Sequence, residues 1–247
     1  MKKIINDPEQ VVDEMLKGMV KAHSTIERVK GTNVLIRSEI PKKVTLVSGG
    51  GSGHEPSHGG FLGTGMLDGA VAGEVFTSPT PDQVFEAIKA VDQGEGVLLV
   101  IKNYTGDVMN FEMAKELAEA EDIDVKQVIV NDDVAVEDST YTTGRRGIAG
   151  TIFIHKIAGA AAEDKLSLDE VQKVANKVIK NVRTMGMSLS PCIVPAAGEP
   201  SFELEENEME IGLGIHGEPG VVKKEIQSAD KIASELVGKI LDDIEYK

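Results

Sequence analysis

The sequence is poor in the features that mark secreted or membrane-spanning proteins. It contains one cysteine, Cys192, so a disulfide within the chain is excluded and a reducing compartment fits. No apolar run approaches the roughly 20 residues that a transmembrane helix needs. The opening residues MKKIINDPEQ turn polar too soon for a signal peptide. We therefore expect a cytoplasmic protein that has no membrane partner.

Positive charge is also scarce. The chain has 26 Lys and Arg residues against 41 Asp and Glu residues, which gives a net charge of −15, and no basic cluster stands out. Nucleic acids and anionic membranes attract basic faces, so we expect no nucleic-acid partner. The 247 residues, 41% of them hydrophobic, suffice for one large or two modest domains with a proper core.

Apolar runs alternate with helical patterns along most of the chain. Short apolar runs predict strands at 44–47, 71–76, 97–101 and 128–130. Periodic or capped segments predict helices at 7–19, 80–91, 107–117, 146–162 and 168–185. This alternation is typical of βαβ units, so we expect an α/β fold with a mostly parallel sheet and flanking helices. A ligand should then lie at the C-terminal ends of the strands.

Polar residues predict where several helices begin. Asp7 is placed to cap a helix with Pro8 in its first position, and 80–83 has the pattern of a capping box. Asp107 is the natural N-cap of the helix that follows the strand at 97–101. A capping carboxylate accepts backbone hydrogen bonds, which lowers its pKa and weakens it as a base.

Two short motifs invite readings that their surroundings oppose. His54-Glu55-Pro56-Ser57-His58 has the H-E-x-x-H spacing of a zinc protease, but it requires a helix, and Pro56 and the flanking glycines disfavour one. We expect no metal site there. The segment 212–217 matches G-x-G-x-x-G, yet no apolar helix follows, so we expect no nucleotide site of the usual kind. The glycines at 49–53 would still let backbone N–H groups approach a small ligand.

The histidines and one lysine leave several interpretations open. His54 and His216 lie among glycines at strand ends, where each is either a ligand-binding or a loop residue. His23 and His155 fall in helical stretches and are expected to be packing or surface residues, and His58 is expected to be loop structure. Lys102 ends a buried strand, either as a solvent-reaching lysine or as a carbonyl-reactive amine.

Six longer blocks carry a specific resemblance. They are SGGGSGHEP (48–56), FTSPTPDQ (76–83), GVLLVIKNYTGDVMNFE (96–112), DDVAVEDSTYTTGRRG (132–147), VPAAGEPSF (194–202) and MEIGLGIHGEPG (209–220). Together they resemble the dihydroxyacetone-binding subunit of the phosphotransferase-system-dependent dihydroxyacetone kinases. Short strands and Pro/Gly turns replace the βα pattern after residue 185. We therefore expect a substrate-binding α/β domain at 1–185 and, at 186–247, the start of a smaller α+β domain that is incomplete relative to the family.

The resemblance implies that one subunit binds the substrate and that another supplies the phosphoryl group. This chain would hold dihydroxyacetone and pair as a homodimer. A separate subunit would carry ADP and magnesium as the phosphoryl relay, which the phosphotransferase system recharges. The resemblance implies no cofactor and no metal in this chain.

The resemblance also implies roles for particular residues. His216 would form a covalent hemiaminal with the substrate ketone, and His54 and Asp107 would give acid–base assistance at the accepting hydroxyl. The substrate would be bound by Gly51, Ser52, Gly53, His54, Lys102, Asp107 and His216.

The implied chemistry is physically reasonable, but two alternative functions remain open. A free imidazole, with its pKa near 6.5, is mostly neutral at pH 7 and can attack a carbonyl without prior activation. Glycerol has no carbonyl and would escape such capture. One alternative function is a non-catalytic dihydroxyacetone sensor that activates a transcription factor. Another is an aldolase-like enzyme in which Lys102 forms a Schiff base.

Overall fold

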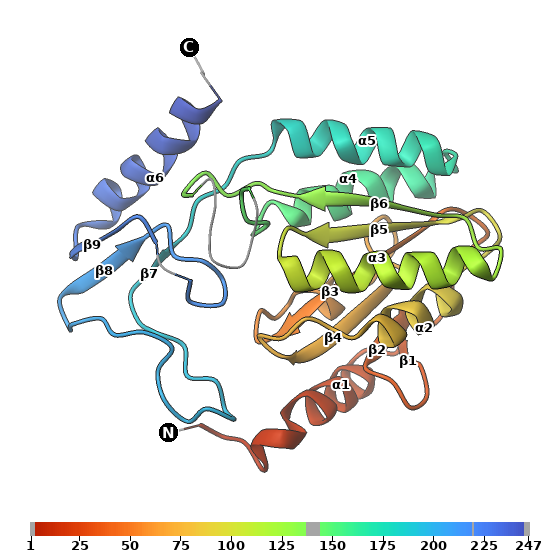
Figure 1. Ribbon diagram of the computed structural model, residues 1–247, viewed down its shortest axis with the longest axis horizontal. Coiled ribbons are helices and arrows are strands. Elements are labelled where there is room, and N and C mark those ends of the chain that lie inside the picture. Colours follow the sequence, from red (N-terminus) through yellow and green to blue (C-terminus); the bar gives the residue numbers. More distant parts are fainter. Residues whose placement is uncertain (1–2, 137–143, 219, 245–247) are drawn as a thin grey trace.

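A six-stranded, mostly parallel sheet lies at the centre of the protein (Figure 1). The structure is a computed structural model that describes residues 3–136, 144–218 and 220–244. The parallel strands, in spatial order, are β4 (Gly69–Val75), β3 (Thr45–Ser52), β5 (Val97–Lys102) and β6 (Val125–Val130). Two antiparallel strands extend the sheet beyond β4, namely β2 (Val34–Arg37) and β1 (Ile26–Arg28). The predicted α/β fold with a mostly parallel sheet is confirmed.

Helices cover both faces of the sheet (Figure 1). One face carries α2 (Pro81–Val91) and α3 (Thr105–Ala120), and the other carries α4 (Thr151–Glu163) and α5 (Leu168–Asn181). A short 3-10 turn, η1 (Pro8–Gln10), leads into α1 (Val11–Ala22), which packs against β1 and β2. Asp7 accepts a hydrogen bond from the Glu9 N–H, as its predicted capping role requires.

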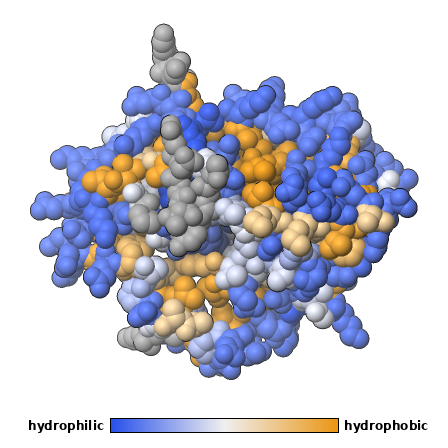
Figure 2. Space-filling view, in the orientation of Figure 1, coloured by the Kyte–Doolittle hydropathy of each residue, from blue (hydrophilic) through white to orange (hydrophobic). Residues whose placement is uncertain are grey.

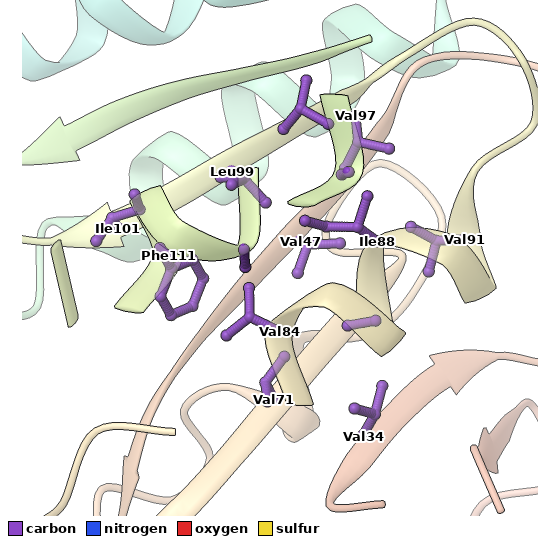
Figure 3. Packing of buried hydrophobic residues seen from close by; sticks show 14 residues of the cluster. Val34, Val47, Val71, Val84, Ile88, Val91, Val97, Leu99, Ile101 and Phe111 are labelled. Atoms are coloured by element: carbon purple, nitrogen blue, oxygen red, sulfur yellow. The ribbon is translucent and has the colours of Figure 1, made fainter. Parts of the chain in front are cut away.

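Strand β5 explains why two helical layers form. All of its residues are buried, and alternate side chains point to opposite faces of a strand. Leu98 and Val100 pack with the α4 and α5 side, whereas Leu99 and Ile101 pack with the α2 and α3 side. Figure 3 shows the packing on the α2 and α3 side, where Leu99 and Ile101 lie close to Phe111 of α3. An apolar run of this kind needs cover on both faces.

The core around Ile88 gives a test of this packing. Ile88 of α2 is fully buried, whereas Ile157 of α4 is 43% exposed. We expect Ile88→Val to lower the free energy of unfolding by about 0.5 to 1.5 kcal/mol, because it leaves a small void. The matched helical control Ile157→Val should change it by less than about 0.5 kcal/mol. Urea denaturation of both variants measures the difference, and equal effects would contradict the assigned core.

Two features of the strands differ from expectation. The strand predicted at 44–47 continues through the glycine-rich segment to Ser52, because its backbone pairs with β4 there. Strands β1 and β2 were not predicted, because they are only three and four residues long and carry little pattern.

Helix starts were predicted less well than helix positions. Thr80 is the N-cap of α2 but its side chain makes no capping bond, and Gln83 instead accepts from the Asn33 N–H, so the predicted capping box is wrong. Helix α3 begins earlier than expected, with Tyr104 as N-cap, which places Asp107 inside the first turn. Helix α4 starts at Thr151 rather than near Arg146. Helix α5 ends at Asn181 rather than near 185.

A second, smaller sheet lies beyond the C-terminal ends of the parallel strands (Figure 1). It is antiparallel and consists of β7 (Met187–Ser188), β8 (Glu208–Ile211) and β9 (Val222–Glu225), followed by α6 (Ala229–Asp243). The predicted division at residue 185 stays a prediction. Buried Arg146 joins the two sheets, since it donates to the Asp133 carboxylate at 2.8 Å and to the Gly212 carbonyl at 2.7 Å.

Helix α3 exposes apolar side chains, although the chain as a whole is highly charged. Met109, Met113 and Leu117 are exposed at intervals of four residues, and Figure 2 shows apolar side chains in a line along this helix. Residues four apart share one helix face. Helix α3 therefore presents an apolar stripe to the outside while Phe111 and Ala114 pack inward. Among the described helices, none combines the length and apolarity that crossing a membrane requires.

Candidate active site

Residues far apart in the sequence meet at the C-terminal edge of the parallel sheet. Lys102 is the last residue of β5, His54 follows β3, and Asp107 lies in the first turn of α3. His216 comes from the turn between β8 and β9. The rings of His54 and His216 lie edge to face with centroids 4.9 Å apart. The fold therefore brings together the residues that the sequence singled out.

Aromatic rings enclose His216. Tyr104 and Phe76 approach it edge to face, with centroid distances of 4.7 and 5.6 Å, and Phe76 also stacks on His54 at 4.8 Å. Beside these rings lies a cavity of about 720 Å³ that Phe76, Tyr104, His216 and Glu218 help to line. The cage fixes the plane of the His216 ring and leaves room for a small molecule.

Glu218 fixes the orientation and tautomer of His216. Its Oε1 lies 2.9 Å from His216 Nδ1, and its Oε2 accepts the His216 backbone N–H at 3.0 Å. Although burial raises the pKa of Glu218, the hydrogen bonds from the ring and the backbone N–H of His216 help to bring that pKa below its ordinary value. An ionised carboxylate only accepts, so the proton sits on Nδ1. The lone pair of Nε2 is then free for a substrate.

Asp107 is the candidate base. It is 2% exposed, and its Oδ1 has no partner among the described residues. Burial raises the pKa of Asp107, and this outweighs the opposing effects of the Ser78 hydroxyl and the Lys102 charge. This outcome corrects our expectation that an N-cap role would lower the pKa, because Tyr104 occupies the cap and Asp107 is desolvated. A carboxylate with a raised pKa is a stronger base.

Lys102 is buried near this carboxyl, and half-buried His54 lies near Lys102. Burial lowers the pKa of Lys102, while the charges of Asp107, Asp132 and Glu218 counteract the change. Burial and the Lys102 charge lower the pKa of His54 to about 3. His54 is thus neutral at physiological pH, and its Nε2 has no hydrogen-bond partner in the described part of the chain.

The glycines at the end of β3 allow close packing near the site. A Cβ on Gly51 would come within 2.5 Å of the Thr77 backbone nitrogen, and one on Gly53, which has a φ of 103°, within 2.7 Å of the Phe76 ring. Side chains are therefore excluded at both positions. The Ser52 hydroxyl donates to the Gly73 carbonyl at 2.7 Å, so it is committed to the sheet.

Neither the H-E-x-x-H motif at 54–58 nor the G-x-G-x-x-G motif at 212–217 adopts the structure that its function would require. Residues 53–58 form turns rather than a helix, so His54 and His58 do not share a helical face. His58, expected to be loop structure, is buried against Ser48 and His155. His155 is a packing residue within α4, as expected, whereas exposed His23 lies just past the end of α1. The segment 212–217 leads into β9 rather than a helix.

Several site residues escaped the sequence analysis. Phe76, Tyr104 and Glu218 all fall in the blocks that carry the resemblance, but nothing in the local pattern of Phe76 and Tyr104 marks a role. Glu218 offered the clearest signal, because it follows His216 by two residues. Residues 137–143, which belong to the block at 132–147, lie outside the described residues.

Comparison with known proteins agrees with the resemblance seen in the sequence. Residues 17–247 match the model of the Dak1 domain. A dihydroxyacetone-binding subunit of a PTS-dependent dihydroxyacetone kinase from Listeria innocua is 59% identical, with 97% of this chain and 74% of that protein covered. A dihydroxyacetone-binding subunit of a PEP-dependent dihydroxyacetone kinase from Escherichia coli is 51% identical, with 98% and 68% covered.

Solved structures of related proteins have the same fold. The dihydroxyacetone kinase of C. freundii superposes with a TM-score of 0.91 at 38% identity, covering 98% of this chain and 45% of that one. A dihydroxyacetone kinase operon co-activator superposes with a TM-score of 0.89 at 37% identity, covering 98% and 73%. The chain therefore belongs to the Dak1 domain family, whose relatives described above include dihydroxyacetone-binding subunits of kinases.

Proposed function

We propose that this chain captures dihydroxyacetone as a hemiaminal on His216 and presents a hydroxyl of the captured ketone for phosphorylation. The observation that carries the proposal is the arrangement of His216. Its Nδ1 is engaged by Glu218, its ring lies against that of His54, and its charge state is felt by Asp107, which in turn interacts with Lys102. A nucleophile, a desolvated carboxyl and two hydrogen-bonding groups thus converge on one small space.

The capture step needs no external reagent. The lone pair of His216 Nε2 forms a bond to the carbonyl carbon, and the π electrons of the carbonyl move to its oxygen. The ring gives up its Nδ1 proton towards Glu218, and the former carbonyl oxygen takes up a proton to become a hydroxyl. In sum, one proton passes from the ring to that oxygen, and the product is a neutral hemiaminal.

Capture prepares the substrate for transfer. Phosphoryl transfer depends mainly on position and charge, so an acceptor hydroxyl fixed through a covalent bond supplies much of what catalysis needs. Asp107 Oδ1 would accept the proton of that hydroxyl. His54, which is neutral, would assist by hydrogen bonding rather than as a charged acid. Gly51, Ser52 and Gly53 would contribute backbone groups, since the Ser52 hydroxyl is already bonded.

The phosphoryl donor would come from another subunit. We propose a separate kinase subunit that carries ADP and magnesium as a relay. Once the phosphotransferase system has phosphorylated the ADP to ATP, this subunit would supply the phosphoryl group, and the magnesium would neutralise its charge. In this chain the G-x-G-x-x-G segment runs from β8 to β9 and offers no helix N-terminus to a pyrophosphate. We further propose that the chain acts in the cytoplasm as a homodimer.

A sensor function is the second candidate, because the chain is similar to the operon co-activator at 37% identity. A sensor needs to capture the ketone but does not need a base at the accepting hydroxyl. Incubation with dihydroxyacetone and a kinase subunit whose bound ADP has first been phosphorylated to ATP separates the two functions. We expect dihydroxyacetone phosphate only when both subunits are present. Capture on His216 without any product would favour the sensor.

A further inference from the structure

A buried arginine lies between the parallel sheet and the turn that carries His216. Arg146 is fully buried, and a charged side chain is almost never buried in this way unless it is paired. Its Nε donates to the Asp133 carboxylate at 2.8 Å, and its Nη2 donates to the Gly212 carbonyl at 2.7 Å. Its Nη1 is also buried but has no hydrogen-bond partner among the described residues. Two of the three nitrogens are thus engaged in hydrogen bonds, and the position of the third needs an explanation.

The backbone around Arg146 is fixed on the ends of the parallel strands. The Arg146 carbonyl accepts the Asp133 N–H at 3.1 Å. A Cβ on the next residue, Gly147, would collide with the Val130 carbonyl oxygen and would lie 2.9 Å from the Lys102 Cα. Arg146 therefore extends from the ends of β5 and β6, next to residues of the proposed site.

The turn that Arg146 contacts is held together by its own hydrogen bonds. Gly212 opens this turn, directly after β8. The Gly214 N–H donates to the Glu218 carbonyl at 3.0 Å, and the His216 N–H donates to the Glu218 carboxylate, also at 3.0 Å. Because residues 214–218 form one hydrogen-bonded turn, a contact at Gly212 helps to fix where the His216 ring lies.

The unpaired Nη1 of Arg146 lies beside the carboxylate that orients His216. A Cβ on Gly214 would lie 2.5 Å from Arg146 Nη1 and closer still to Glu218 Oε2, so both atoms lie against the same piece of backbone. A cation near a carboxylate favours its ionised form. Ionised Glu218 keeps the proton on His216 Nδ1 and leaves Nε2 as the nucleophile. Burial and the Glu218 charge raise the pKa of Tyr104 and the Arg146 charge opposes this change, so the guanidinium charge also reaches the aromatic cage.

We propose that Arg146 is a positioning residue for ketone capture, which fixes the turn at Gly212 and supports the ionised Glu218 that orients the catalytic histidine. This inference rests on the proposed function, because Arg146 acts on the substrate only through His216. Its planar, forked guanidinium suits the task, since it reaches the Asp133 carboxylate and the Gly212 carbonyl together while its charge lies beside Glu218. A purely structural ion pair would hold the two sheets together without affecting the ring of His216.

Arg146→Gln tests the assignment, because it removes the charge and the fork but keeps a polar side chain. Nitrogen-15 NMR of labelled histidine reports the tautomer of His216 without any substrate, and intact-mass titration reports the affinity for dihydroxyacetone. We expect the parent to carry the proton on Nδ1. In the folded variant we expect a mixture of tautomers and capture weakened about tenfold to a hundredfold, as the loss of a charged hydrogen bond predicts. Arg146→Lys keeps the charge but not the fork, so it should recover part of both effects.

Arg145→Gln is the matched control. The neighbouring residue Arg145 forms an ion pair with Asp243 of α6, so this variant also removes a charged contact to the C-terminal part of the chain. That ion pair does not involve the turn that carries His216. We therefore expect the tautomer of His216 and the affinity for dihydroxyacetone to match the parent, even if urea denaturation shows a lower stability.

The outcomes separate this inference from the proposed function. Absence of any His216 adduct in the parent would overturn the proposed function and, with it, this role of Arg146. A normal adduct in the parent, together with an unchanged tautomer or an unchanged affinity in folded Arg146→Gln, would overturn the role of Arg146 alone. Should Arg146→Gln fail to fold, Arg146→Lys decides. Weaker capture by folded Arg146→Lys would then support the assignment, and an affinity equal to that of the parent would overturn it.

Discussion

Asp107→Asn should lower the rate of dihydroxyacetone phosphorylation by about 10²- to 10⁴-fold, the usual contribution of a general base. The amide keeps the size of the carboxyl and can still accept from Ser78, but it cannot take the proton of the accepting hydroxyl. Capture should persist, because His216 and Glu218 are untouched. The turnover number with the ADP-carrying subunit and its recharging system measures the first effect, and intact-mass analysis of the adduct measures the second.

The pH dependence of turnover gives this prediction a second readout. A base acts only when ionised, so turnover should fall as the pH drops through the pKa of Asp107. Because burial raises that pKa, the fall should begin at a higher pH than for an ordinary carboxyl near 3.9. The Asn variant should lose this limb of the profile. Unchanged turnover in a folded Asp107→Asn protein would remove Asp107 as the base.

His216→Gln should abolish the adduct with dihydroxyacetone completely. Glutamine can hydrogen-bond to the site but has no nucleophilic nitrogen, so binding would depend on hydroxyl contacts alone. The variant should therefore lose its discrimination against glycerol, which has hydroxyls in similar places but no carbonyl. Parallel binding titrations with the two compounds measure this ratio.

Borohydride distinguishes the hemiaminal from a lysine adduct. It reduces an imine on Lys102 to a stable amine but should leave a histidine hemiaminal unreduced. A permanent mass increase mapped to Lys102, and retained in His216→Gln, would support the aldolase-like alternative against our assignment. Burial lowers the pKa of Lys102, so this rival has a physical basis and needs the direct test.

The sequence predicted the parallel core because its signal is local. Residues 97–101 are apolar throughout, and such a run needs helices on both faces. The glycines at 49–51 suggested no strand, since glycine disfavours strands. Glycine is needed in β3 because neighbouring backbone comes too close for a side chain. A Cβ on Gly49 would lie 2.6 Å from the Val71 carbonyl oxygen. That reason is visible only in three dimensions.

The candidate site was also predictable in part, because some of its residues carry a local signal. Glycine-flanked His54 and His216 stood out locally, and the structure places their rings together. The electrostatics of Asp107 could not be foreseen, because its burial depends on how α3 begins and on its tertiary neighbours. The polar contacts of His58 involve β3 and α4, which are remote in sequence. Long-range contacts of this kind leave no pattern along the chain.

The central claim is a covalent bond between His216 Nε2 and the ketone carbon. Carbon-13 NMR of dihydroxyacetone labelled at that carbon tests it most directly. With the parent protein we predict that the ketone signal is replaced by that of a tetrahedral carbon bonded to oxygen and nitrogen, and that His216→Gln retains the ketone signal. A bound ligand whose carbon remains a ketone in the parent, or becomes tetrahedral in His216→Gln as well, would contradict the account.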